Sequence, residues 1–437
     1  MANDFSKEEK VAFEQLLEGF NDALVMSRNV NVYNYNQTDA ARTTAFPSSV
    51  SPNYGTIWRP QPYIMTSVTS TPGSPVSFTD KEQLSVPASI TNTKTVAWGL
   101  NSVELRDALQ EGRLAAGANQ KLASDINLSV MQAATALGSL VVTTGTPAGS
   151  FDDIALCDSL MNETGVMGDS RYLSLSSRSY NGLAGNVVGT TRSFGAQNRS
   201  DKAFERAYVG MVSSFETYKQ DYALRKTAYA GGALTVNTLD AGGNVNYVPQ
   251  AYTTSTAGTL NVDNRFQTIT LSSNVGVAAG DAFTIEGIEA VHLITKSPTG
   301  QPKTFRVVSV GAANTVVITP PIISADNAPT QAELQYQNCD RAGAGLAAAA
   351  ITFLNTATAD YNCFWHKSAI ELLPGRLAIP ENAGVAVMRA TTDQGIEVVM
   401  QKQFAIASSL TQYRVDVLYG TAVLNPEMCG ILLFDQP

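Results

Sequence analysis

The sequence predicts an α+β protein in which a small β domain is inserted into a larger domain of helices and strands. Two helical patterns come first, short alternating strands joined by Gly, Asn, Asp and Pro turns then fill residues 231–340, and strand patterns return near the end. With 437 residues, the chain is long enough for two or three domains. An insertion of this kind is tolerated because the ends of a domain tend to lie close together.

The first segment, residues 1–28, is predicted to form an N-terminal helix. Ser6 and Glu9 have the spacing of a capping box, in which each side chain accepts a hydrogen bond from the other residue's backbone. Apolar residues then recur at helical spacing, so we expect an amphipathic helix of about 20 residues. These apolar residues are Val11, Phe13, Leu16, Leu17, Phe20, Leu24 and Val25.

Residues 29–100 are predicted to form a strand and an extended loop. The stretch from Thr56 to Ile64 resembles a short strand bounded by prolines. The polar stretch from Thr66 to Asn92 is expected to be a long exposed loop that a partner orders, since loops of this length are usually functional. Thr93–Trp98 then alternates like a strand.

Residues 101–230 are predicted to contain a long spine helix followed by an α+β core. Asn101 and Glu104 cap the helix, which is expected to run to about Leu140 and to reach roughly 60 Å. One face of it carries Leu105, Leu109, Leu122, Ile126, Val130, Ala134 and Leu137. We then expect a helix at Phe151–Glu163, a strand at Arg171–Leu175 and a helix at Ser177–Ala184.

Residues 231–340 are predicted to fold as a small β barrel with a one-sided apolar core. Three pairs of residues alternate as such a core requires: Phe283 and Ile285, Phe305 and Val307, Val316 and Ile318. Residues 341–437 are expected to close the larger domain. This last segment begins with a helix-biased run, Ala342–Leu354, and continues with strands at Gly384–Phe404 and Tyr413–Leu424.

Composition argues against several classes of function. The formal net charge of -9 gives the chain no general attraction for phosphate backbones, which disfavours direct nucleic-acid readout. The longest apolar stretch is too short for the ~20 residues of a membrane-spanning helix, so we expect no membrane contact.

Only 15% of residues are charged, which suits extended contact surfaces between copies of a protein. The scattered cysteines at 157, 339, 363 and 429 indicate reduced thiols in a cytoplasmic protein.

No catalytic, metal-binding or cofactor-binding residues are predicted. His292 and His366 have no neighbours at the spacing that metal or general-base chemistry requires, which favours structural roles. Asp152 and Asp153 could bind a metal, but their position after Ser150 at a helix start favours interaction with the helix dipole. The glycine-rich stretches lack the phosphate-binding patterns. We therefore expect a protein that is not an enzyme.

Trp58 and Arg59 could anchor a contact between chains. Arginine beside an indole in an extended segment can form bidentate pairs with carboxylates of a neighbouring chain. An exposed arginine on a loop is an equally good interpretation.

The order of elements, together with local phrases, resembles the coat proteins of short-tailed phages of the P-twenty-two type. The phrases are Ile57–Gln61, Leu100–Leu109, Gly231–Val236 and Arg414–Met428. The resemblance covers nearly the whole chain in order. It implies the tailed-phage capsid fold of the HK-ninety-seven type, with peripheral and axial domains, an extended loop and an inserted domain.

The resemblance also implies a function and partners. The chain is expected to be a major capsid protein of the virion that self-assembles, as hexamers and pentamers, into the icosahedral shell around a double-stranded DNA genome. Expected partners are a scaffolding protein, a portal protein, possible decoration proteins and, indirectly, the packaged DNA. Assembly is expected in the host cytoplasm. The alternatives are a phage tail or surface β protein and an unrecognised hydrolase.

An acidic stripe on the first helix has two interpretations. Glu14, Glu18 and Asp22 follow one another at i,i+4 spacing, away from the apolar face. The stripe is either a solvated acidic face or, as the resemblance implies for the N-terminal region, a contact for a basic segment of the scaffolding protein.

Overall fold

The computed structural model divides into two compact units, each drawn from distant parts of the sequence. Unit 1 comprises Met1–Ile57, Pro87–Gln132 and Ile370–Ala422, and unit 2 comprises Trp58–Val86, Ala133–Ala369 and Val423–Pro437. The structure describes residues 5, 7–33, 56–61, 72, 73, 75, 78, 80–101, 104, 108–166, 168–191, 210–220, 224–237, 246–255, 258–325, 329–341, 348–380 and 384–436.

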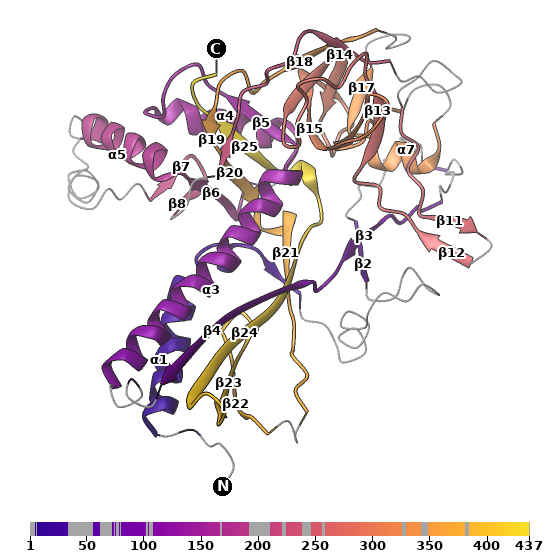
Figure 1. Cartoon of the computed structure of the whole chain (residues 1–437). Coiled ribbons are helices and arrows are strands. Elements are labelled where there is room, and N and C mark those ends of the chain that lie inside the picture. Colours follow the sequence, from indigo (N-terminus) through magenta and orange to yellow (C-terminus); the bar gives the residue numbers. More distant parts are fainter. Residues whose placement is uncertain are drawn as a thin grey trace. The chain divides into compact units, whose positions relative to one another are not determined.

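Unit 1 is built on a six-stranded sheet (Figure 1). Its central strand, β24 (Leu410–Val423), pairs on one side with β23 (Glu397–Ala405) and on the other with β4 (Asn92–Asn101). β22 (Ala386–Thr391) lies beyond β23, while β21 (Ile370–Pro374) and β1 (Asn31–Val32) complete the sheet. The strands expected at Thr93–Trp98, Gly384–Phe404 and Tyr413–Leu424 are therefore confirmed.

Two helices accompany this sheet, α1 (Lys7–Ala23) and α3 (Ala108–Leu137). After α1 and the short 3-10 turn η1 (Ser27–Asn29), the chain enters β1. Met26 donates its backbone N–H to Oδ1 of Asn127 on α3 at 3.1 Å, and the hydroxyls of Ser129 and Tyr419 lie 2.7 Å apart. These contacts tie α3 to the end of α1 and to β24.

The cap hydrogen bonds predicted for the long helix are present, but α3 begins at Ala108 and ends earlier than expected. Asn101 donates its backbone N–H to Glu104 Oε2 at 3.0 Å, and Glu104 donates its own to Asn101 Oδ1 at 2.9 Å. The helix stops at Leu137, because Leu140 already belongs to β5 (Leu140–Thr143). Its 30 residues correspond to about 45 Å, less than expected. The predicted apolar positions Leu122, Ile126, Val130 and Ala134 are buried. The side chains of Leu105 and Leu109 lie outside the described residues.

The predicted strand near Thr56 is β2 (Ile57–Pro60), which pairs with β3 (Ser85–Ala88) to form a two-stranded ribbon. The expectation of an exposed loop over Thr66–Asn92 is wrong for its second half. Residues at every second position from 84 to 90 are buried, as the two-residue period of extended chain produces when one face packs inward. Most of residues 62–79 lie outside the described part.

One sheet of unit 2 forms the core of the α+β segment. Its six strands run in the order β5, β25 (Cys429–Leu433), β20 (Asn362–His366), β6 (Arg171–Leu175), β8 (Phe215–Lys219) and β7 (Met211–Val212). The helices α4 (Phe151–Glu163) and α5 (Ser177–Thr191) contribute to the same apolar core, which contains Met161, Leu183, Phe215 and Phe364. The α4 prediction is confirmed, while α5 extends beyond Ala184.

The inserted segment forms a second sheet of unit 2, with seven strands. Their order is β10 (Leu234–Thr235), β18 (Ala350–Phe353), β14 (Ala282–Val291), β15 (Pro298–Val310), β16 (Thr315–Thr319) and β13 (Gln267–Thr270), with β17 (Cys339–Arg341) also paired to β14. A bridge between Val236 and Leu271 joins its two edges, so the sheet closes on itself. All six predicted alternating apolar residues are in its buried core.

The helix expected at Ala342–Leu354 is wrong for its described part, residues 348–354. Ala350–Phe353 is strand β18, which pairs with both β10 and β14. Ile351 and Phe353 turn toward the barrel core, and the stacked rings of Phe353 and Tyr229 are 3.6 Å apart. Pairing on both edges outweighs the helix propensity of the alanines, which is worth only a few tenths of a kcal/mol per residue. Residues 342–347 lie outside the described part.

Several short elements were not anticipated from the sequence. They are the hairpin of β11 (Tyr252–Ser255) and β12 (Gly258–Asn261), the pair of β9 (Arg225–Lys226) and β19 (Ala359–Asp360), the helix α7 (Gln331–Tyr336), and the 3-10 turns η3 (Lys367–Ala369) and η4 (Pro426–Met428). Thr330 and Glu333 form a capping box at the start of α7. Such short pieces depend on local capping and pairing more than on hydrophobic periodicity.

Candidate functional site

The two histidines make structural contacts. His292 lies just past β14 rather than inside a strand, and its Nδ1 accepts the backbone N–H of Thr295 at 3.2 Å. Its ring covers Gly165, where an added Cβ would lie 2.9 Å from the ring carbon Cε1. Nδ1 of His366 accepts the backbone N–H of Ser368 at 3.2 Å, and burial lowers the pKa of His366. In the described part of the chain, no group of three or more His, Cys, Asp or Glu side chains could hold a metal ion.

The acidic pair at the start of α4 forms a helix cap. Ser150 Oγ accepts the backbone N–H of Asp152 at 3.1 Å, and the carboxylate of Asp153 accepts the backbone N–H of Ser150 at 3.2 Å. All four cysteines are buried, and burial raises the pKa of the thiols of Cys157, Cys363 and Cys429. Raised thiol pKa values suppress nucleophilic reactivity.

The acidic side chains of α1 divide between a buried and an exposed side. Glu14 and Glu18 are exposed, whereas the side chain of Asp22 lies outside the described residues. Glu9 is buried, and its Oε1 accepts hydrogen bonds from Tyr413 at 2.7 Å and from Lys402 at 2.6 Å. The sequence interpretation assigned Glu9 only to a helix cap with Ser6, which lies outside the described part. Glu9 lies one helical turn before Phe13, which is buried, and this spacing was the signal that Glu9 also lies on the buried side of α1.

Trp58 and Arg59 lie on β2 and are both half-buried. The indole nitrogen of Trp58 is buried without a hydrogen-bond partner among the described residues. Both residues belong to unit 2, whereas Glu14 and Glu18 belong to unit 1. The predicted contact residues therefore come from different units.

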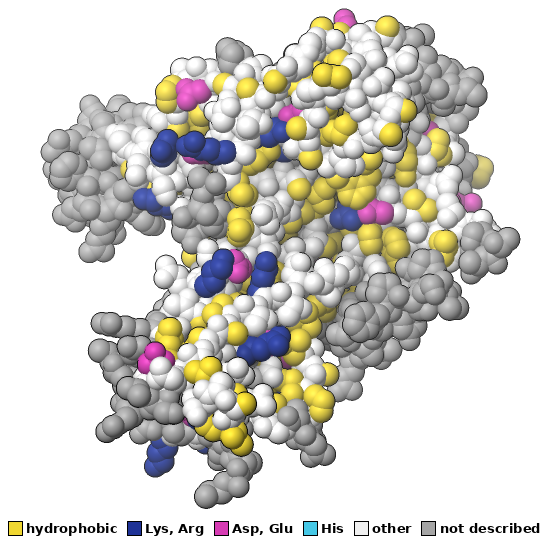
Figure 2. Space-filling model, viewed as in Figure 1, with side chains coloured by type: hydrophobic (Ala, Val, Ile, Leu, Met, Phe, Trp, Pro, Cys, Tyr) yellow, Lys and Arg dark blue, Asp and Glu magenta, His cyan; other side chains and the backbone are white. Residues whose placement is uncertain are grey.

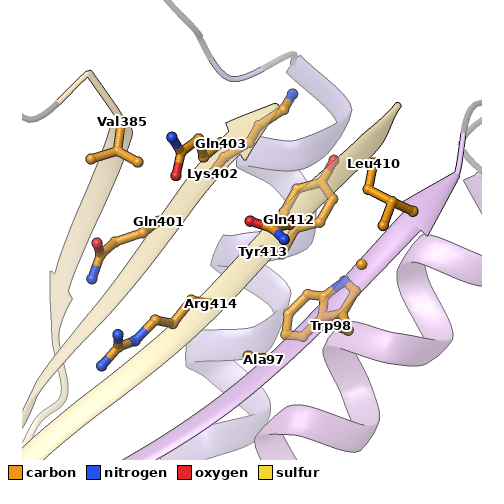
Figure 3. A pocket seen from close by; sticks show the side chains of 11 residues that line it. Ala97, Trp98, Val385, Gln401, Lys402, Gln403, Leu410, Gln412, Tyr413 and Arg414 are labelled. Carbon is orange, nitrogen blue, oxygen red and sulfur yellow. The ribbon is translucent and has the colours of Figure 1, made fainter. Parts of the chain in front are cut away.

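A groove crosses the sheet of unit 1, which we call the sheet groove (Figure 3). It encloses about 730 Å³. A Cβ added at Gly99 on β4 would have the carbonyl oxygen of Thr411 as its nearest neighbour, at 3.9 Å, so this part of the groove is open. The groove is lined by Ala97, Trp98, Gly99, Val385, Gln401, Lys402, Gln403, Leu410, Gln412, Tyr413 and Arg414.

Polar side chains in the sheet groove are held by their neighbours. Arg414 donates from Nε to Asp416 at 2.7 Å, and Gln401 donates to the same carboxylate at 2.9 Å. Trp98 and Tyr413 stack with their ring centroids 5.6 Å apart. Amide and guanidinium groups that are held in place beside small residues suit hydrogen bonding to a polypeptide. Sequence patterns missed this groove because β4 lies far from β23 and β24 in the sequence.

The described residues on the face in Figure 2 show no broad field of one charge. On the face in Figure 2, the charged side chains of the described residues stand as separate groups among neutral and apolar atoms. Among the described helices, none has the length and apolarity to cross a membrane.

Comparison with known proteins identifies the family. The model of the family described as "P22 coat protein - gene protein 5" matches residues 1–435. A structure from Mycobacterium phage Che8 is similar over 94% of this chain and 90% of its own, at 9% identity and a TM-score of 0.45. The capsid of Helicobacter pylori bacteriophage KHP30 is similar over 94% of this chain and 89% of its own, at 10% identity and a TM-score of 0.39.

A third structure covers a smaller part. The CUS-3 coat protein I-domain is 40% identical over 29% of this chain and 98% of its own, with a TM-score of 0.22. The family match is the decisive finding, because it spans nearly the whole sequence and both units. The chain therefore belongs to the P22 coat protein family and is a major capsid protein that assembles with copies of itself into a phage shell.

Proposed function

We propose that copies of this chain form the hexamers and pentamers of an icosahedral shell that encloses a double-stranded DNA genome. The observation that carries this proposal is the family match over residues 1–435. The formal net charge of -9 favours DNA that is enclosed over DNA that is bound by a basic surface.

One contact between neighbouring copies is proposed at Trp58 and Arg59. These adjacent residues lie on the two-stranded ribbon of β2 and β3, half-buried and close to the exposed Pro60. A guanidinium can bind a carboxylate of a second copy through two parallel hydrogen bonds. Tryptophan beside it supplies rigid apolar area, which is typical of residues that dominate interfaces.

A second contact, with a scaffolding protein, is proposed at the exposed side of α1. Glu9 anchors one side of the helix to β23 and β24, whereas Glu14 and Glu18 are exposed. Asp22 continues their row in the sequence. A basic segment of a scaffolding protein would be attracted to these charges, and screening over ~8 Å at physiological salt would keep the contact weak and reversible.

The remaining partners follow from the same proposal. They are a portal protein and possible decoration proteins, and assembly takes place in the host cytoplasm. The buried thiols of Cys157, Cys363 and Cys429, which form no disulfide, are compatible with a reducing compartment.

The proposal is tested by expressing the full chain with and without the neighbouring genes of its genome. Negative-stain electron microscopy and sedimentation should show closed icosahedral shells of uniform size when the neighbouring genes are present. Chain expressed alone should give irregular shells or free capsomers. A uniform small oligomer in both samples contradicts the proposal.

A further inference from the structure

Unit 2 contains a cavity whose lining includes none of the residues proposed above for contacts. It encloses about 270 Å³ and is lined by residues next to the β2–β3 ribbon, of the inserted segment, of the α+β core and of the C-terminal segment. We call it the junction cavity. Its apolar lining consists of Leu84, Leu293, Ile294, Pro320, Pro321, Ile323, Tyr336, Pro426 and Met428.

The apolar wall of the junction cavity is well ordered by packing. Leu84, Ile323 and Tyr336 form a small core cluster of buried residues. Ile294, in contrast, is 56% exposed. A cavity of roughly 150 Å³ with apolar walls can stay dry and bind benzene, so the junction cavity has room for a somewhat longer hydrocarbon group.

Most polar groups around the junction cavity already have partners. Arg265 is paired with Asp263 at 2.6 Å and also donates to Val423 O at 2.7 Å. Lys303 is paired with Glu427. The amides of the lining residues Asn264, Gln335 and Asn338 are bonded to neighbouring backbone and side-chain groups.

Lys296 is the exception among the cations here. Its Nζ donates to the carbonyl oxygen of Gln337 at 3.0 Å, and no carboxylate of the described residues lies within ion-pair distance of it. An ammonium has three donors, so two remain for another acceptor. Arg265 and Lys303 each have a carboxylate at ion-pair distance, whereas Lys296 has none. Burial lowers the pKa of Lys296, and Glu427, which also lines the cavity, partly offsets this shift.

We propose that the junction cavity binds a small molecule with a hydrocarbon body and a carboxylate, in the class of short-chain fatty acids. The hydrocarbon lies against Leu84, Leu293 and Ile323, and the carboxylate accepts hydrogen bonds from Nζ of Lys296. Because the lining comes from several separate segments of unit 2, such a ligand stabilises their packing on one another and raises the thermal stability of the capsid protein.

The test uses the full chain, with hexanoate as the probe and 1-hexanol as its uncharged analogue. Ligand-observed NMR should show saturable binding of hexanoate, with hexanol about tenfold weaker because it lacks the charge-assisted hydrogen bond. Lys296→Met keeps the hydrocarbon stem and should remove the preference for the acid. Lys219→Met, an exposed lysine elsewhere in unit 2, is the matched control and should retain it.

A second variant tests the cavity itself. Leu293→Trp places a bulky indole ring at this half-buried position, where it fills part of the cavity. It should abolish binding of both probes while the circular dichroism spectrum remains that of the folded protein. The proposal is overturned if hexanoate shows no saturable binding, if Leu293→Trp binds it as before, or if Lys296→Met still prefers hexanoate to hexanol.

Discussion

Glu9 and Tyr413 are 404 residues apart in the sequence, yet the Tyr413 hydroxyl donates a hydrogen bond to Glu9 Oε1 at 2.7 Å. Lys402 donates to the same oxygen at 2.6 Å. The carboxylate thus connects α1 to two strands of the unit 1 sheet. One cation and one hydroxyl compensate the charge of the buried Glu9 carboxylate well. Removing this carboxylate leaves Lys402 without that partner.

Glu9→Gln should lower the free energy of unfolding by about 2 kcal/mol, since hydrogen bonds to charged groups contribute roughly 1.5–3 kcal/mol. Thermal unfolding of the unassembled subunit provides the measurement. Glu14→Gln, at an exposed position on the same helix, should change stability by less than about 0.5 kcal/mol. Equal effects of the two variants would show that the Glu9 contact does not hold α1.

Arg306 should be more important for stability than its place in an alternating strand suggests. It is fully buried and donates from Nη2 to the carbonyls of Thr135 at 2.8 Å and Gly280 at 3.0 Å. The Arg306→Lys variant loses the planar guanidinium, whose nitrogens donate to two carbonyls at once, and this should lower the free energy of unfolding by about 2 kcal/mol. Amide hydrogen exchange near the end of α3 should also accelerate. Arg178→Lys, an exposed position, serves as the control.

The inserted β domain should need β18 in order to fold alone. A fragment of residues 229–355 retains the pairing of β18 with β10 and β14 and should give dispersed amide NMR signals. A fragment of residues 231–340 lacks that strand, exposes two strand edges and should give collapsed signals. Dispersed spectra from the shorter fragment would refute this role of β18.

Acidification should destabilise unit 2 through His366. Burial lowers the pKa of His366 below its ordinary value, so the unfolded state takes up a proton at a higher pH than the folded state does. Stability therefore falls as the pH drops through the ordinary histidine pKa of about 6.5 and levels off below the lowered one. Melting temperatures across this window should depend less on pH in His366→Gln. Identical pH dependence in the variant and the parent protein would exclude His366 as the cause.

Scaffold-directed assembly should depend on the exposed acidic side chains of α1. The double variant Glu14→Lys, Glu18→Lys should lose uptake of scaffolding protein while its thermal unfolding stays nearly unchanged, since exposed charges contribute little to stability. The matched control is Glu163→Lys, Glu286→Lys, two exposed positions in unit 2. Normal uptake by the α1 variant, or scaffold affinity that is indifferent to salt, would leave only a solvated acidic face.

Local physical chemistry made much of the fold predictable from the sequence. The reciprocal hydrogen bonds of Asn101 and Glu104 need only residues three positions apart, and they are present. The alternation of Phe283 with Ile285, and of Phe305 with Val307, requires only the two-residue period of a strand, and all four side chains are buried in the inserted domain.

Tertiary structure alone decided the features that depend on distant segments. Ala350–Phe353 is a strand because β10 and β14 supply partners on both of its edges, a condition that no local propensity encodes. Arg306 is buried because the end of α3 offers carbonyl acceptors, and Glu9 is buried because Lys402 and Tyr413 compensate its charge. Short-range patterns specify which face of an element is apolar, whereas the partners of a buried polar group come from chain segments that only folding brings together.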